Sequence, residues 1–326
     1  MSVHDEFSRP LLSIVIANYN YGCFLKDAIE SVLTQDVDGQ VELIICDAAS
    51  TDDSVDVIER YSNGLPEKTS LYEWQHDTNI SHVGRPCITW WCSERDGGQS
   101  AAFNKGFAHA RGRFLTWLNA DDLLLPGTLR RLKLAMDGHP DCEWFVGGCF
   151  WLDPMLRVFK CGRARRMSRY RAQHGFVNVC GPSSFFSKDL YERAGKIDER
   201  FHYTMDTDLW LRFAIKENVV FRPFVDYAWG LRLHPKAKMS GHKFTSDGKI
   251  LEGRKSREAF RKEETRMKQL ELEEQWSNEK VGVAFKAMSR VMRFFSADFI
   301  PALLSRVDTR RFIGMRLVDV MGLKDR

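Results

Sequence analysis

The 326-residue sequence lacks the motifs of several common enzyme classes. No G-x-G-x-x-G follows its first apolar run, neither Gly-Lys pair belongs to a phosphate loop, and no G-x-S-x-G elbow is present. These absences argue against a dinucleotide-dependent dehydrogenase, a P-loop kinase and an α/β serine hydrolase.

Long apolar runs and paired cysteines are missing too. Without a stretch of about 20 apolar residues, no membrane-spanning helix is expected. The polar N-terminus MSVHDEFSRP is unlike a signal peptide. Eight cysteines without a C-x-x-C pair predict neither a zinc site nor a disulfide framework. We therefore expect a cytoplasmic protein.

The charge is small and unevenly distributed. A formal net charge of +4 does not indicate a nucleic-acid partner. Residues 280–326 hold ten Lys/Arg against four Asp, which gives this stretch +6 and the remainder −2. The excess is a property of the C-terminal end.

Apolar runs and helical patterns alternate in the first 120 residues. Leu11–Ala17, Val41–Cys46 and Phe114–Leu118 have the continuous apolar pattern of strands covered on both faces. Residues 25–33 and 99–110 between them have helical spacing. This alternation predicts an α/β fold with a doubly wound sheet, in which ligands bind at the carboxyl ends of the strands.

The pattern changes twice further on. Residues 142–162 predict a hairpin, and helices and strands follow up to about residue 245. Beyond it, residues 254–279 are charged and predict a solvated helix. We therefore expect a catalytic domain over residues 1–245 and a helical C-terminal extension over residues 246–326.

Acidic residues stand at the expected strand ends. Asp47 ends the second strand, and Asp121 and Asp122 follow the strand that ends at Leu118. Paired carboxylates without soft ligands nearby suit Mg²⁺ or Mn²⁺. The alternative is that an aspartate there caps the next helix.

Five segments in order resemble glycosyltransferase family 2. They are SIVIANYN, VELIICDAASTD, SERDGGQSAAFNKGFAHARGRFLTWLNADD, GPSSFFSKDLYERAGKIDERFHYTMDTDLWLRFA and LRLHP, within Leu11 to Ser240. The resemblance implies a GT-A fold, which is a Rossmann-like mixed sheet, and inverting, metal-dependent transfer from a nucleoside-diphosphate sugar.

The resemblance also assigns roles to residues. Those implied to bind the nucleotide sugar are Ala17, Asn18, Tyr19, Asp47, Ser50, Asp96, Gln99, Asn104, Lys105, Asn119 and Asp121. Asp121, Asp122 and His234 would hold a divalent cation, Mn²⁺ or Mg²⁺, in a motif whose first acid is Asn119 here. Asp206 matches the general base. Taken alone, Asp206 could be a helix cap and His234 a sheet-edge histidine.

The implied function is transfer of one hexosyl or N-acetylhexosaminyl unit, most often from a UDP-sugar, to a saccharide or lipid-linked acceptor. No Q-x-x-R-W follows Asp206, so a non-processive enzyme is expected. Five arginines in residues 163–171 could capture an acidic acceptor or form a solvated loop. The alternatives are a nucleotidyltransferase and an inactive nucleotide-sugar-binding module, and an oligomer is possible.

The C-terminal extension carries an apolar stripe from Val281 to Phe299, after which Pro301 is expected to end the helix. A second apolar set with four arginines lies between Leu303 and Leu317. These helices could dock on the catalytic domain or a second subunit, or lie on an anionic membrane.

Overall fold

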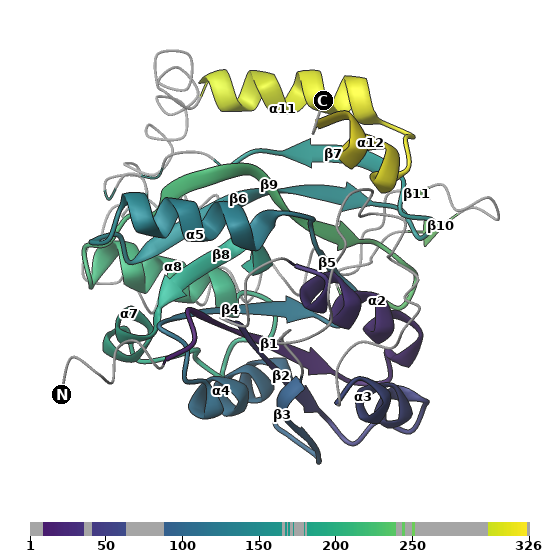
Figure 1. The fold of residues 1–326 in the computed structure, drawn as a ribbon, viewed down its shortest axis with the longest axis vertical. Coiled ribbons are helices and arrows are strands. Elements are labelled where there is room, and N and C mark those ends of the chain that lie inside the picture. Colours follow the sequence, from purple (N-terminus) through teal and green to yellow (C-terminus); the bar gives the residue numbers. More distant parts are fainter. Residues whose placement is uncertain are drawn as a thin grey trace, which may run out of the picture.

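A nine-stranded mixed sheet forms the centre of the protein in a computed structural model (Figure 1). The structure describes residues 9–35, 41–62, 88–164, 167, 169, 172, 179, 181–238, 243–244, 250–251 and 299–324. The order across the sheet is β3-β2-β1-β4-β8-β6-β9-β5, and β7 pairs with β6. The doubly wound α/β fold predicted from the sequence is confirmed.

The bounds of the elements follow chain order. The strands are β1 Leu12–Asn18, β2 Val41–Asp47, β3 Ile88–Ser93, β4 Phe114–Asn119, β5 Leu123–Leu124, β6 Trp144–Leu152, β7 Val158–Gly162, β8 Ser184–Ser187, β9 Arg222–Arg232, β10 Lys243–Phe244 and β11 Ile250–Leu251. The helices are α2 Gly22–Leu33, α3 Ser54–Ser62, α4 Gln99–His109, α5 Thr128–Gly138, the 3₁₀ turn η2 Gly181–Ser183, α7 Lys188–Arg193, α8 Met205–Ile215, α11 Phe299–Phe312 and α12 Leu317–Lys324.

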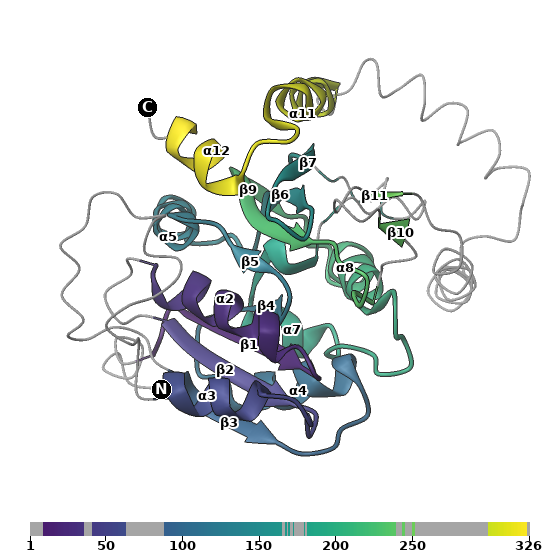
Figure 2. The ribbon, with the colours of Figure 1, turned by 90° about the vertical axis from the view of Figure 1, so that its right-hand side faces the viewer.

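Two helical layers bury the two faces of the sheet. Alternate residues of β1 divide between them: Ile14 packs in the cluster with α2, α3 and α5, and Val15 packs in the cluster with α4, α7 and α8. Because β1, β2 and β4 are parallel, their carboxyl ends meet at one edge (Figure 2). That edge is where the expected ligand site lies.

The second half of the sheet brings a further strand to the same edge. β6 and β7 form the predicted antiparallel hairpin, and β8 runs antiparallel to both β4 and β6. β9 is parallel to β6, so it ends on the same side as β1 and β4. Residues 222–232 form one continuous strand that leads straight to His234.

The described part of the C-terminal extension returns to the sheet. α11 packs along β7, and after Gly314 the backbone hydrogen-bonds to Val158 and Leu156. Pro301 lies in the first turn of α11 and does not end a helix there, because proline is tolerated where the helical N–H groups have no partner. The stripe predicted from Val281 lies outside the described residues, apart from its last member, Phe299, which begins α11.

The charged helix expected at residues 254–279 also falls outside the described residues. Among the helices that the structure describes, none has both the length and the apolar character needed to cross a lipid bilayer. The domain boundary at residue 245 stays a prediction.

Candidate active site

Asp47 holds three strand ends together. Its buried carboxylate accepts from the Asn18 amide at 2.7 Å and from the Ser93 hydroxyl at 2.6 Å. It also accepts from the backbone N–H of Ser50 at 2.9 Å and from the Ser50 hydroxyl at 2.5 Å. A carboxylate offers about four acceptor sites, so these bonds use its capacity. Asp47 thus joins the ends of β1, β2 and β3 to the loop after β2, where the base pocket is expected.

The loops after β1 and β2 are locked to each other above Asp47. Asn20 and Ala49 both have φ of 55°, a left-handed conformation that is uncommon outside glycine. The Ser50 hydroxyl accepts from the N–H of Asn20 at 2.8 Å, and the Asn20 side chain accepts from the N–H of Thr51 at 2.8 Å. Tyr19 between them is 60% exposed, so its ring is available for stacking on a base.

Asp47→Asn tests this arrangement. An asparagine offers one acceptor oxygen and an NH₂ donor, so at least one of the N–H or O–H groups now facing Asp47 would lose its acceptor inside the protein. We expect a loss of about 1–3 kcal/mol in the free energy of unfolding. Denaturant unfolding measures it, with Asp56→Asn on the exposed side of α3 as the matched control. Equal stability of the two variants would contradict this role.

A chain of hydrogen bonds crosses the carboxyl end of β4. Lys238 donates to the Gln99 side-chain oxygen at 2.8 Å, and the Gln99 amide donates to Asn119 at 2.9 Å. The Asn119 amide then donates to Asp122 at 2.7 Å, and Asp122 also accepts from the backbone N–H of Arg232 at 3.0 Å. The chain joins the start of α4 to the ends of β4 and β9.

Asp121 and His234 meet at this edge. Nε2 of His234 lies 3.0 Å from Oδ2 of Asp121, and both side chains are almost fully buried. The imidazole is held by Phe24, whose ring centroid is 4.2 Å away, and by an edge contact with Tyr21 at 5.5 Å. Nδ1 of His234 is buried without a hydrogen-bond partner among the described residues.

The Asp121–His234 pair fits a divalent cation. Oδ2 of Asp121 and Nε2 of His234 are 3.0 Å apart, so both atoms could contact one ion in place of the hydrogen bond between them. Carboxylate oxygen suits Mg²⁺ and Mn²⁺, and imidazole is a common metal ligand. Two ligands from the protein leave room for diphosphate oxygens.

The carboxylate of Asp122 makes contacts other than the metal contact that the resemblance implies. It is fully buried, and burial, with the charge of Asp121 as a second cause, raises its pKa well above the usual range. Its oxygens accept from Asn119 and Arg232. In the part of the chain that the structure describes, no three His, Cys, Asp or Glu side chains come together as a metal-binding group. The structure thus brings Asp121 and His234 together, whereas Asp122 is hydrogen-bonded to Asn119 and to the backbone of β9.

Asp206 lies in the first turn of α8. One of its oxygens accepts from the backbone N–H of Thr207 at 2.6 Å. The other faces Gly181, where an added β-carbon would lie 3.2 Å from it. Burial raises the pKa of Asp206, while the hydrogen bonds from Thr207 and, to a lesser extent, the ammonium of Lys238 oppose this rise. A half-buried carboxylate with a raised pKa and one oxygen unused by α8 can take a proton.

Asp208, two residues later, has a structural role. It is fully buried and accepts from the guanidinium of Arg212 at 3.0 and 2.5 Å. Arg212 also donates to the carbonyl of Ala194. This pair fixes α8 on the loop that follows α7, so Asp208 is not placed to replace Asp206 as a base.

Three of the residues implied to bind the donor make hydrogen bonds or ion pairs within the protein. The side chain of Asn104 makes four hydrogen bonds, to Tyr191, Glu199 and both the N–H and the carbonyl of Ile197. Those contacts use its donors and its acceptor, so it holds the 197–199 loop on α4. Lys105 pairs with Glu94 at 2.9 Å, and Asp96 accepts from the N–H of Gly98 at 2.8 Å. Ala17 is half-buried at the end of β1.

Sequence reasoning missed the segment after β9. Residues 232–238 cross the site, and the Tyr21 hydroxyl donates to the carbonyl of Lys236 at 2.7 Å. Lys238 donates to Gln99 and to the carbonyl of His202, which precedes α8. The LRLHP segment draws attention to His234. Nothing in the spacing of the sequence indicates that Lys238 contacts both α4 and the loop before α8.

Comparison with known proteins agrees with this fold. Residues 13–193 match glycosyl transferase family 2. An uncharacterized glycosyltransferase of Nostoc sp. is 36% identical over 121 residues, which are 37% of this chain and 31% of that protein. The matched segments span 31% to 66% of the length of the first curated relatives.

Two solved structures share the architecture. S. aureus TarS 1–349 in complex with UDP-GlcNAc has a TM-score of 0.51 at 15% identity, covering 69% of this chain and 59% of that one. A mannosyltransferase from Pyrobaculum calidifontis, in complex with GDP-Man and Mn²⁺, has a TM-score of 0.50 at 14% identity, covering 92% and 87%. At these identities the likeness shows the fold alone, which is GT-A. The family match extends over more than half of the chain and includes the strand ends that carry Asn18, Asp47 and Asp121, and the protein therefore belongs to glycosyl transferase family 2.

Proposed function

We propose that the protein is an inverting glycosyltransferase that moves one sugar from a nucleoside-diphosphate sugar to a saccharide or lipid-linked acceptor. The observation that carries this proposal is the separation of two acidic groups. Asp121 with His234 lies at the ends of β4 and β9, while Asp206 lies on α8 with its pKa raised by burial. A single displacement needs this division, with one group under the leaving diphosphate and one base at the acceptor.

Asp206 would act as the base. Its oxygen near Gly181 would accept the proton of the acceptor hydroxyl while that oxygen attacks the anomeric carbon. The sugar–phosphate bond breaks on the opposite side, so the configuration at the anomeric carbon inverts. The hydrogen bond from Thr207 holds the other oxygen of Asp206 in place during the proton transfer.

Asp121 and His234 would hold the divalent cation. When bound there, Mn²⁺ or Mg²⁺ would neutralise the charge that develops on the departing diphosphate. Asp122 would act through others: by accepting from Arg232 and Asn119 it fixes the end of β9 relative to β4, and with it the position of His234. We therefore assign Asp122 a positioning role in place of the ligand role that the resemblance implies.

A UDP-sugar is our first choice of donor. The TarS structure of the same fold contains UDP-GlcNAc, and the mannosyltransferase contains GDP-Man and Mn²⁺. A hexosyl or N-acetylhexosaminyl unit is therefore proposed. Ala17, Asn18, Tyr19 and Ser50 form the wall of the proposed base pocket, with Gln99 and Asn119 nearer the diphosphate.

One assay separates this function from its two alternatives. The protein is incubated with UDP-, GDP- and TDP-sugars plus Mn²⁺, and release of the nucleoside diphosphate is followed. We expect slow release from one class of donor, stopped by a chelator. Release of pyrophosphate from a nucleoside triphosphate would instead indicate a nucleotidyltransferase, and donor binding without any turnover would indicate an inactive binding module.

Lys238 gives a prediction of its own. Its ammonium donates to Gln99 on the proposed diphosphate side, and its charge acts on Asp206, the proposed base. A cation there would attract a doubly charged leaving group. Lys238→Ala should raise the KM for the donor about ten- to a hundredfold, the scale of a lost hydrogen bond to a charged group. Lys236→Ala, in the same segment but exposed, is the control. Equal kinetics for the two variants would remove Lys238 from the site.

The proposal also gives the C-terminal extension a role in membrane contact. We infer that residues 280–326 bring the enzyme to the cytoplasmic face of a membrane, where a lipid-linked acceptor is held, and that residues 1–245 form the catalytic domain. The outer surface of α11 supports this: Leu304 and Val307 are exposed together with Arg306 and Arg310.

A further inference from the structure

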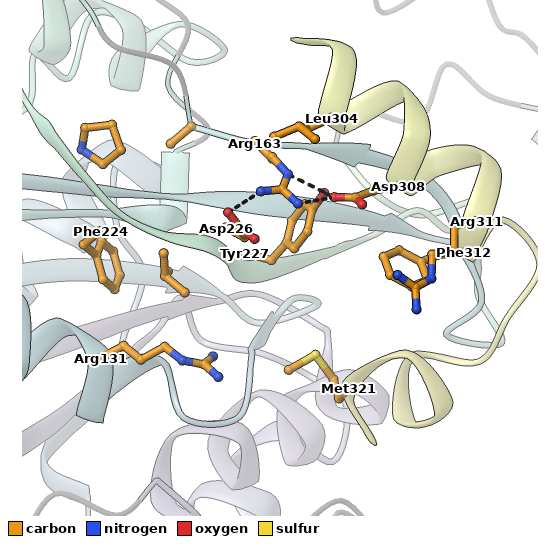
Figure 3. A pocket seen from close by; sticks show the side chains of 13 residues that line it. Arg131, Arg163, Phe224, Asp226, Tyr227, Leu304, Asp308, Arg311, Phe312 and Met321 are labelled. Atoms are coloured by element: carbon orange, nitrogen blue, oxygen red, sulfur yellow. Dashed lines mark hydrogen bonds and ion pairs between the residues drawn. The ribbon is translucent and has the colours of Figure 1, made fainter. Parts of the chain in front are cut away.

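A cavity of 730 Å³ lies at the opposite end of β9 from the candidate active site. Its walls come from α5, the first half of β9, the end of β7 and the two C-terminal helices (Figure 3). From Val225 in the cavity to Arg232 at the active site, β9 runs seven residues, or about 23 Å at 3.3 Å per residue. The cavity is therefore separate from the proposed donor and acceptor sites.

The acids in the cavity already have cationic partners. Arg163 contacts Asp226 at 2.5 Å and Asp308 at 2.8 Å, and the Tyr227 hydroxyl also donates to Asp308. Attraction to Asp308 and Asp226 raises the pKa of Arg163, despite its partial burial, so it stays charged. Arg163 belongs to the arginine-rich loop, and these ion pairs show that it holds α11 on the sheet.

Two further arginines give the lining its positive excess. Arg131 reaches into the cavity from α5 and Arg311 from α11, so the lining holds three arginines against two aspartates (Figure 3). Its remaining surface is largely apolar, including Phe224, Phe312 and Met321. Guanidinium groups above an apolar floor suit an anionic group attached to hydrocarbon.

α11 docks on the sheet through polar side chains and Phe312, and leaves Leu304 and Val307 outside. Toward β7, the hydroxyls of Ser305 and Thr309 accept from the backbone N–H groups of Arg163 and Cys161 at 2.9 Å. Asp308, the one acid of α11, also points inward. Ser305, Asp308 and Thr309 thus share the docked face of α11 with Phe312, while Leu304 and Val307 lie on the outer face, where a surface helix usually carries polar residues.

The rim of the cavity is consequently apolar and basic. Leu304 is 37% exposed and Val307 50% exposed on α11, and Leu134, one turn after Arg131 on α5, is 66% exposed. Arg306 and Arg310 are exposed beside them. Apolar side chains interspersed with arginines are typical of surfaces that lie at the interface of an anionic membrane.

We propose that this cavity binds the phosphate head group of an anionic membrane lipid. Arg131 and Arg311 contact the phosphate, and the lipid chains leave over Leu304 and Leu134 toward the bilayer. The proposal rests on the peripheral membrane contact proposed above and gives that contact a specific site. Because its lining shares no residue with the candidate active site, the cavity anchors the enzyme and does not present the acceptor.

The test compares two pairs of arginines in the full chain. Arg131→Gln with Arg311→Gln removes the charges in the cavity, and Arg306→Gln with Arg310→Gln removes equal charge from the outer side of α11. Binding is measured by sedimentation with vesicles of phosphatidylcholine alone or mixed with phosphatidylglycerol. Loss of two favourable basic contacts corresponds to about a 30-fold weaker affinity. Both pairs should contribute to vesicle binding on this scale, because Arg306 and Arg310 lie on the rim that faces the membrane. The two variants are therefore distinguished by their binding of single lipid molecules.

Soluble probes identify the source of the phosphate. Short-chain phosphatidylglycerol below its micelle concentration should bind to the wild type and not to the cavity variant in calorimetry, and glycerol phosphate should bind much more weakly. Equal binding of the short-chain lipid by the cavity variant and the outer variant, no preference of the wild type for anionic vesicles, or glycerol phosphate binding as tightly as the lipid would each overturn the proposal. Thermal unfolding shows whether the variants are folded. Nucleotide release is measured without vesicles, so failure of the transfer function is seen separately.

Discussion

Asp206→Asn should lower turnover by about 10²–10⁴-fold and leave donor affinity near that of the wild type. General-base catalysis contributes on this scale, and a base acts only in the transition state. The Asn side chain has nearly the same shape, and its oxygen can still accept from the N–H of Thr207. Single-turnover kinetics with saturating donor give turnover, and calorimetry with the nucleoside diphosphate and Mn²⁺ gives affinity.

The pH dependence supplies an independent readout of the same residue. Only the deprotonated base can act, and burial raises the pKa of Asp206. Activity should therefore fall as the pH is lowered through this raised pKa, at a higher pH than for an ordinary carboxyl group near 4. If Asp206→Asn stays active, or keeps the same acid limb, another group is the base. Asp208 would then be a poor candidate, because it is committed to Arg212.

Asp121→Asn should abolish metal-dependent donor binding and reduce activity at least about a hundredfold. The variant keeps the size of the side chain but removes the negative charge opposite His234, so the leaving diphosphate loses the stabilisation that the cation supplies. Mn²⁺ titrations followed by calorimetry, with and without nucleoside diphosphate, measure the loss. Unchanged Mn²⁺ dependence of donor binding would show that Asp121 is not a ligand.

Asp122→Asn is the matched comparison for Asp121→Asn and should lower the stability of the protein more than its affinity for Mn²⁺. Asp122 accepts from two N–H donors, so an amide there brings its own NH₂ against one of them and leaves a buried group unpaired. We expect a loss of about 1–3 kcal/mol in the free energy of unfolding. Mn²⁺ affinity, measured well below the unfolding temperature, should change far less than in Asp121→Asn. A loss as large as that of Asp121→Asn would return Asp122 to the set of ligands.

The sheet could be predicted because its central strands are buried on both faces. The run at Leu12–Asn18 has an unbroken apolar character that fits a parallel strand covered by helices, and the acids that follow such strands necessarily gather at one edge. Asp121 and His234 lie 113 residues apart in the sequence and still meet there.

Roles at the site could not be read from residue type alone. Asp47 and Asn104 stand in positions that match donor contacts, yet their hydrogen-bonding capacity is used within the protein. Ser50 could equally have capped α3, but the backbone N–H of Ser54 binds the side chain of Asp52 instead. These choices depend on side-chain directions set by the packed fold, which a linear pattern does not contain. Lys238 was missed for the same reason.

The anomeric configuration of the first-formed product tests the central claim most directly. The enzyme, Mn²⁺ and an α-linked UDP-sugar are mixed in an NMR tube, and the anomeric proton of the transferred or slowly hydrolysed sugar is recorded before mutarotation. A single displacement with Asp206 as the base predicts the β-anomer first, and its absence in Asp206→Asn. First formation of the α-anomer would contradict the account.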